Sequence, residues 1–168
     1  ILNYDEVNID QAREKHLNQG AVPGLSDGGA HVGRICDGSC PTTLLTHWTR
    51  DRSRGERLPL GAVVRMQTRD TAEAVGLMDR GRLAPGYRAD VNLIDYDALK
   101  LHAPIVVHDL PAGGRRLLQK ASGYAATILA GEVTYREGEA TGALPGRLLR
   151  GPRPAPAKRA GAILEKVP

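Results

Sequence analysis

In residues 68–91, TRDTAEAVGLMDRGRLAPGYRADV, the pattern of the chain changes from helical to strand-like. Asp70 and Glu73 have the spacing of a capping box, which predicts the start of a short helix there. Further along, Pro85-Gly86 suits a type II turn, because proline fixes φ at the second position and glycine tolerates the third. Helices are therefore expected before this segment and strands after it.

The helical half should contain further amphipathic helices. Residues 7–19 have helical spacing and Gly20 is a typical helix end, as is Gly76 for the short helix above. Proline suits the first turn of a helix, and Pro41 and Pro59 each precede an apolar pattern. The first of these helices carries Leu44, Leu45 and Trp48 on one side, and Leu60, Val63, Val64 and Gln67 define the stripe expected to be buried in the second.

In the second half, strands are expected over residues 89–96, 124–130 and 132–136. The last two flank Gly131 as a hairpin, and Glu137-Gly138 marks the next turn. Because alanine tolerates a positive φ poorly, Ala130 leaves the type of the hairpin turn open.

The composition is that of one soluble domain, with 168 residues, 25% of them charged and 41% hydrophobic. A complete (β/α)8 barrel needs about 250 residues, so this chain alone is too short for one. No run approaches the ~20 apolar residues of a membrane span, and residues 1–10 do not resemble a signal peptide. We therefore expect a cytoplasmic protein that does not interact with membranes. The chain begins with Ile-Leu and not with Met, which suggests a fragment.

The excess of positive charge lies at the C-terminal end of the chain. Residues 150–168 hold five basic side chains and one acidic side chain, which account for the whole net charge of +4. The neutral remainder argues against nucleic-acid binding. Residues 151–168 are rich in proline and small residues and are expected to form a flexible basic tail.

Cys36 and Cys40 lie four residues apart and could in principle bind a metal or form a disulfide. A structural zinc site needs four ligands, and the chain has no second cysteine pair. We expect two reduced, partly buried thiols.

One aspartate stands out as a candidate functional residue. The apolar run 21–25 predicts a buried strand that ends at Ser-Asp-Gly-Gly, residues 26–29, so Asp27 can project into an open site. The same residues are common in turns, where the aspartate only accepts backbone hydrogen bonds, and both interpretations stay open. His31 is either a second polar group of that pocket or an ordinary loop residue. Arg34 can bind a carboxylate with two hydrogen bonds, although the chain has many basic residues.

The motifs of the middle and end of the chain resemble a known superfamily. Residues 68–77, 79–86 and 89–91 resemble the closing signature of the amidohydrolase superfamily, which joins the last barrel helix to a small β-sandwich. Three further segments resemble its N-acyl-D-amino-acid deacylase (D-aminoacylase) branch: GLSDGGAH (24–31), DLPAGGRRL (109–117) and GALPGR (142–147).

The resemblance implies an α/β fragment in three parts. Residues 1–78 would be the C-terminal end of a TIM-type (β/α)8 amidohydrolase barrel, with strand 8 at 21–25 and helices after it. Residues 79–150 would be part of the composite β-sandwich, and 151–168 the tail. A lone eighth strand has unpaired edges and an uncovered apolar face, so we expect the missing N-terminal barrel portion or an oligomer partner to cover it.

The resemblance also implies the chemistry. The complete enzyme would be metal-dependent and contain zinc, with its main ligands upstream of this chain. Asp27 would be the strand-8 aspartate, which takes a proton from the attacking water, passes it to the leaving nitrogen, and is a further candidate metal ligand. His31 and Arg34 fall where similar enzymes place substrate-binding residues. This chain alone is expected to be inactive.

The expected function is hydrolysis of a carbon-nitrogen bond other than a peptide bond, with small-molecule N-acyl-D-amino acids as substrates. One alternative is a cyclic-amide hydrolase of the same superfamily, similar to hydantoinases or dihydroorotases, against which residues 109–117 argue. The other is a non-catalytic fragment or assembly module.

Overall fold

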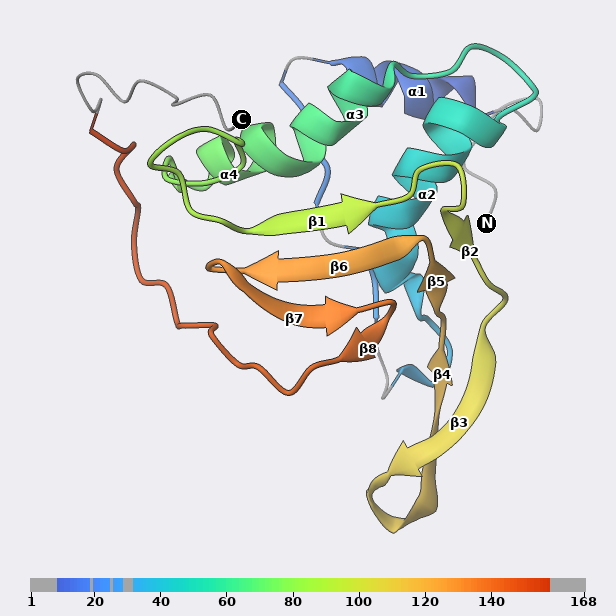
Figure 1. Cartoon of the computed structure of the whole chain (residues 1–168). Coiled ribbons are helices and arrows are strands. Elements are labelled where there is room, and N and C mark those ends of the chain that lie inside the picture. The colour runs from blue at the N-terminus through green and yellow to red at the C-terminus, as the bar shows by residue number, and fades with distance from the viewer. Residues whose placement is uncertain (1–8, 19, 25, 29–31, 158–168) are drawn as a thin grey trace, which may run out of the picture.

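Helices come first along the chain and strands second, as the sequence predicts (Figure 1). The computed structural model describes residues 9–18, 20–24, 26–28 and 32–157. The helices are α1 (Asp10–Leu17), α2 (Cys40–Thr46), α3 (Leu60–Arg65) and α4 (Thr71–Ala74), with π-helical segments His47–Asp51 after α2 and Met66–Asp70 after α3 and 3-10 turns at Asp37–Ser39 and Pro111–Gly113. The strands are β1 (Val91–Ile94), β2 (Lys100–Leu101), β3 (Ile105–Leu110), β4 (Gly114–Leu118), β5 (Ala121–Ser122), β6 (Tyr124–Leu129), β7 (Glu132–Arg136) and β8 (Glu139–Ala140).

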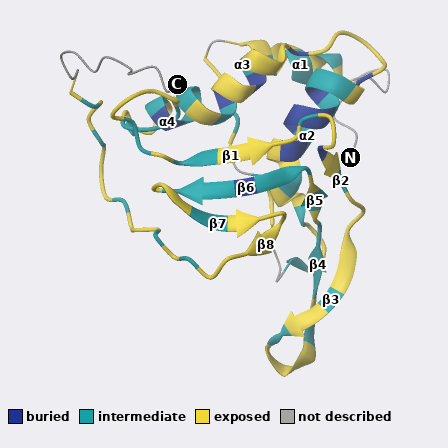
Figure 2. Ribbon diagram, viewed as in Figure 1, coloured by how far each residue is buried: buried dark blue, intermediate teal, exposed yellow. Residues whose placement is uncertain are grey.

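The buried core lies where α2 and α3 meet the segment before β2 (Figure 2). The predicted apolar side of α2 is confirmed, since Leu44, Leu45 and Trp48 are all buried. The rest of this cluster consists of Leu58, Val63 and Leu99. Burial of these side chains supplies the hydrophobic stabilisation that fixes the helices against the strands.

The predicted stripe of α3 is only partly correct. Val63 is fully buried, but Leu60 and Val64 remain 40% and 45% exposed, and Met66 is buried in their place. Val64 lines an open groove between the helices and β1 with a volume of about 490 Å³. The apolar side chain of Val64 therefore faces this open groove, which no described residue fills.

The predicted capping box is wrong. Asp70 is itself helical and makes no capping hydrogen bond, because the π-helical segment before it runs directly into α4. Glu73 instead accepts hydrogen bonds from Arg69 at 3.0 Å and from Arg82 at 2.6 Å. The predicted end of the helix is confirmed, since Gly76 has a φ of +75°.

The strands form antiparallel ladders. The largest sheet has the order β1-β6-β7-β8, and β2 pairs with β5 and β3 with β4. The hairpin predicted around Gly131 is confirmed: β6 and β7 pair antiparallel, with Leu129 opposite Glu132. The predicted type II turn is also confirmed: Gly86 has a φ of +87°, and the Tyr87 N–H donates to the Ala84 carbonyl at 3.1 Å.

The strand expected over residues 21–25 is not found. Residues 20–24 have no strand structure, and Leu25 lies outside the described residues. A parallel barrel strand needs a parallel neighbour to satisfy its backbone groups, and the parallel bridge present in the described part of the chain joins Leu77 to Arg153. The barrel fragment and the sandwich domain remain predictions.

Part of the expected tail contacts the body of the protein. The Arg153 N–H donates to the Gly76 carbonyl, and the Met78 N–H donates to the Arg153 carbonyl, both at 2.9 Å. These backbone hydrogen bonds hold Arg153 against the end of α4, and the flexibility expected of the tail stays a prediction. Residues 158–168 lie outside the described residues.

Candidate functional site

Asp27 is exposed and lies between α1 and α2 in the chain. Its backbone carbonyl accepts a hydrogen bond of 2.9 Å from the Asp37 N–H, which joins the two ends of segment 27–37. Next to it, Gly28 has open space where a side chain would be. Asp27 is itself exposed, so its carboxylate is accessible from solvent.

The other two candidate residues are less defined. His31 lies outside the described residues. Arg34 is described and exposed, and it belongs to the segment that the Asp27–Asp37 hydrogen bond closes. The structure thus brings the backbones of Asp27 and Asp37 together, while substrate contacts by His31 and Arg34 stay predictions.

A hollow of about 310 Å³ lies beside the Asp27 segment. Ser26 and Cys40 stand at its wall, where the Ser26 hydroxyl donates to the Cys40 Sγ at 3.0 Å. Both thiols are unpaired in the structure, and Cys36 is half-buried as expected, whereas Cys40 is exposed. The remaining lining residues are His16, Pro23, Gly24, Thr43, Leu44 and Trp48.

His16 was not among the residues singled out from sequence, although it contributes to this wall. Its ring stands edge-on to the Trp48 ring, with centroids 5.4 Å apart. Burial lowers the pKa of His16 below its usual value, so the neutral form is favoured. The helical spacing of α1 places His16 on one side of that helix, but only the packing of α1 against α2 shows what this side contacts.

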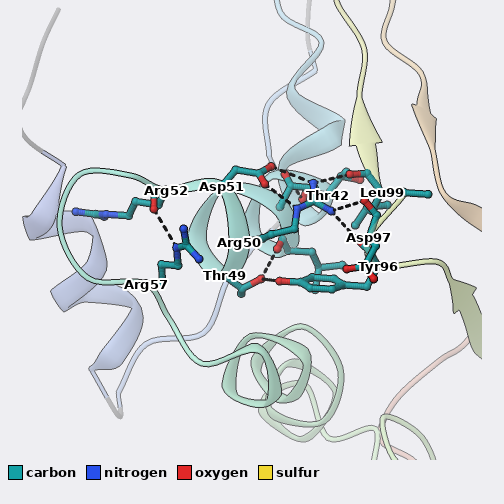
Figure 3. A network of polar contacts seen from close by, with 12 residues as sticks. Thr42, Thr49, Arg50, Asp51, Arg52, Arg57, Tyr96, Asp97 and Leu99 are labelled. Atoms are coloured by element: carbon teal, nitrogen blue, oxygen red, sulfur yellow. Dashed lines mark hydrogen bonds and ion pairs between the residues drawn. The ribbon is translucent and has the colours of Figure 1, made fainter.

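The helix after Asp27 is fixed to the strands by a polar network (Figure 3). The Arg50 guanidinium donates to the backbone carbonyls of Tyr96, Asp97 and Leu99, the last at 2.7 Å. A hydrogen bond from Arg50 to Asp51 raises the pKa of Arg50 and lowers that of Asp51. These bonds anchor the end of the α2 region to the segment after β1.

Arg52 connects the same region to α1. It is 3% exposed, forms an ion pair with Asp10, and donates from Nε to the Arg54 carbonyl at 2.6 Å. Its guanidinium also lies 4.7 Å from the centre of the Trp48 ring, within the range of a cation–π interaction. The hollow beside Asp27 is therefore built on helices that charged side chains hold together.

The described residues do not fit a zinc site. Among them, no group of three histidine, cysteine, aspartate or glutamate side chains is placed to hold a metal ion. Zinc sites in proteins use three or four such ligands, and Asp27 offers one carboxylate. The chain therefore supplies no metal centre through its described residues.

The described part of the chain also contains no helix that is both long and apolar enough to span a membrane. The cytoplasmic location stays a prediction.

Comparison with known proteins places these observations in context. A family model described as the amidohydrolase family matches residues 8–135. Two curated relatives, both named 5-methylthioadenosine/S-adenosylhomocysteine deaminase, come from Desulfitobacterium hafniense strains DSM 10664 / DCB-2 and Y51. Each is 36% identical over 110 residues, which cover 58% of this chain and 26% of the relative. The chain thus spans about a quarter of the length of these relatives, and no solved structure matches it.

Proposed function

The chain belongs to the amidohydrolase family, and from this membership we propose that it is the C-terminal part of a hydrolase that cleaves the amide bond of N-acyl-D-amino acids. The observation that carries the proposal is the exposed Asp27 carboxylate beside Gly28, inside the family match. Hydrolysis of a carbon-nitrogen bond fits both the family and the deaminase relatives.

Asp27 would act as the proton carrier of the reaction. Its carboxylate would accept a proton from the attacking water and then donate it to the amide nitrogen as the carbon-nitrogen bond breaks. The products are a carboxylate and a free D-amino acid. Arg34 would bind the substrate carboxylate with two hydrogen bonds, and His31 would contact the substrate from the same segment.

The metal that the resemblance implies would be held mainly by residues outside this chain. In support of this proposal, the described residues form no metal-binding group of their own. The contribution of the chain would be the Asp27 carboxylate, on a backbone that a hydrogen bond ties to Asp37.

The choice of substrate rests on three sequence segments, residues 24–31, 109–117 and 142–147. In the structure the second of these forms the tip of the β3–β4 hairpin, where Arg116 makes two hydrogen bonds to the Asp109 carboxylate at 2.6 and 2.7 Å. These contacts give that segment a structural role as a turn. Residues 109–117 therefore support the D-aminoacylase branch through their sequence and not through a contact with substrate.

A second candidate function is deamination of a purine nucleoside derivative, which the identity to the two deaminases favours. In that reaction water also replaces an amine at carbon, so the same aspartate would carry the proton. The two functions therefore differ in the substrate and not in the role of Asp27.

The test uses the natural polypeptide that carries these residues, purified from its host through an affinity tag. Its intact mass and metal content would be measured, followed by hydrolysis of N-acetyl-D-amino acids, their L-enantiomers, 5-methylthioadenosine and hydantoins. We expect release of D-amino acids and little activity on the L-enantiomers.

Each other result would contradict the proposal in a different way. Ammonia release from 5-methylthioadenosine alone would favour the second candidate. Opening of hydantoins alone would favour a cyclic-amide hydrolase, and a polypeptide inactive on all of these substrates would favour an assembly module.

A further inference from the structure

Strands β3 and β4 form an arm that extends away from the helices and from the sheet β1-β6-β7-β8 (Figure 1). The arm comprises residues 105–118, and its base is anchored where the Ser39 hydroxyl donates to the Gln119 side chain at 2.7 Å. Beyond this anchor, the two strands pair with each other, with Ile105 opposite Leu118 and Val107 opposite Arg116.

The arm leaves apolar side chains uncovered. Ile105 and Val106 are 53% and 57% exposed, and none of the arm residues is buried (Figure 2). A two-stranded hairpin without a covered face is marginally stable in water. The uncharged, β-branched run Ile105-Val106-Val107 lies on a strand whose outer edge has no neighbour among the described strands, which favours pairing with another chain.

The base of the arm borders a hollow of about 600 Å³ with an acidic balance. The ionisable residues that line it are His102, Lys120, Glu137 and Glu139. Glu139 is paired with Lys120 at 3.4 Å. The exposed Glu137 on the turn between β7 and β8 therefore leaves the hollow with an unbalanced negative charge.

The tip of the arm has the opposite balance. Arg116 is paired with Asp109 through two hydrogen bonds. The neighbouring Arg115 is exposed and gives the tip its positive charge. The tip and the hollow are thus complementary in charge, and they lie at opposite ends of the same arm.

We infer that the arm binds a second copy of this chain, with two arms antiparallel and each tip in the hollow at the base of the other. β3 has six residues, so the arm is about 20 Å long, and an antiparallel arrangement places the tip of one arm beside the base of its partner. A two-fold axis then repeats the contact between Arg115 and Glu137 twice, as expected of an isologous dimer. Ile105, at the base of each arm, then lies beside the tip of the partner, and Val106 lies between the base and the axis.

The test is a charge exchange in the full 168-residue chain, followed by sedimentation velocity over a series of concentrations. Arg115→Glu and Glu137→Arg should each raise the dimer dissociation constant by about tenfold, because each places like charges together at both contacts. The double variant Arg115→Glu/Glu137→Arg restores opposite charges and should return the constant to near its original value. Arg147→Glu, which reverses an exposed arginine outside the arm, serves as the control.

The inference is overturned if the chain is monomeric throughout the series, or if the dimer is insensitive to the two single variants. It is also overturned if both single variants weaken the dimer as predicted and the double variant fails to recover. Circular dichroism of every variant checks that these exposed substitutions leave the fold unchanged.

Discussion

Ala130 stands in the left-handed region of backbone space, with a φ of +54°, next to Gly131 with a φ of +84°. Two successive positive φ values are those of a type I′ turn, in which Asn-Gly is the preferred pair. The Ala130 N–H donates to the Asp90 carboxylate at 2.8 Å, and Asp90 also pairs with Arg80 and Arg88. This hydrogen bond holds the alanine in a conformation that alanine disfavours.

Replacing this alanine should stabilise the protein. Ala130→Asn should raise the free energy of unfolding by about 1 kcal/mol, because asparagine tolerates the left-handed region better. The measurement is urea unfolding followed by circular dichroism. Ala98→Asn, at an exposed position without a positive φ, is the control and should change stability by less than about 0.5 kcal/mol. Equal effects of the two substitutions would show that the backbone at Ala130 is not strained.

His16 should make stability depend on pH. Burial lowers its pKa in the folded state below its ordinary value, so the unfolded state binds more protons in the interval between the two values. The contribution of the neutral ring is complete above about pH 6.5, the ordinary histidine pKa, and is lost as the pH falls toward the folded-state pKa.

Unfolding experiments above and below this interval test the prediction. The loss of stability on acidification should be smaller in His16→Gln than in the unmodified chain, whereas Ser53→Gln, at an exposed residue that does not titrate, should leave the loss unchanged. An identical pH dependence in all three proteins would contradict the packing of His16 against Trp48.

At the scale of elements, the connection from α4 to β1 depends on Gly81. Its φ is +79°, and a Cβ atom there would lie 2.8 Å from the backbone of both Thr68 and Arg69. The close approach explains why glycine is needed where the chain turns back against the π-helical segment after α3. Gly138 has a similar φ of +82° but open space around it.

This difference predicts unequal effects of the same substitution. Gly138→Ala should cost about 1 kcal/mol, the strain of a left-handed alanine. Gly81→Ala carries the same strain and adds a clash with fixed backbone, so it should cost several kcal/mol. The unfolding midpoints of the two variants in urea provide the comparison, and similar midpoints would show that the backbone near Arg69 can move aside.

Turns and helix ends could be predicted from sequence because they depend on neighbouring residues. The Pro85-Gly86 turn, the end of α4 at Gly76 and the hairpin at Gly131 all follow from local backbone preferences. The strand expected at 21–25 depends on a parallel partner, which the described residues do not provide. The capping box failed for a related reason, since the spacing of Asp70 and Glu73 does not reveal that the preceding helix continues.

The candidate site likewise combines residues that the local sequence points to with residues that only tertiary packing brings together. The Ser-Asp-Gly-Gly composition alone left Asp27 open between a turn residue and a site residue, and the resemblance to the amidohydrolase superfamily made it the candidate. The walls of the neighbouring hollow, including His16 and Cys40, come from helices separated in the chain. Periodicity identifies one side of each helix but does not specify how two helices pack, so these residues could not be assigned beforehand.

At the scale of the whole molecule, the core is small and apolar surface remains open. The groove of about 490 Å³ between the helices and β1 lies on one side, and the β3–β4 arm extends on another. Exposed apolar surface of this kind is typical of interfaces. The chain spans about a quarter of the length of its curated relatives, and contact of the groove with a missing barrel portion stays a prediction.

The role of Asp27 in carbon-nitrogen bond hydrolysis is the central claim, and kcat/KM of the tagged natural polypeptide for an N-acetyl-D-amino acid tests it most directly. Asp27→Asn removes the proton carrier, so kcat/KM should fall by at least about 100-fold. Asp37→Asn changes an exposed carboxylate of the same segment, whose backbone N–H still binds the Asp27 carbonyl, and should retain activity within about threefold. A large loss confined to Asp27→Asn, with unchanged circular dichroism, is the predicted result. Retained activity in Asp27→Asn, or an equal loss in both variants, would contradict the account.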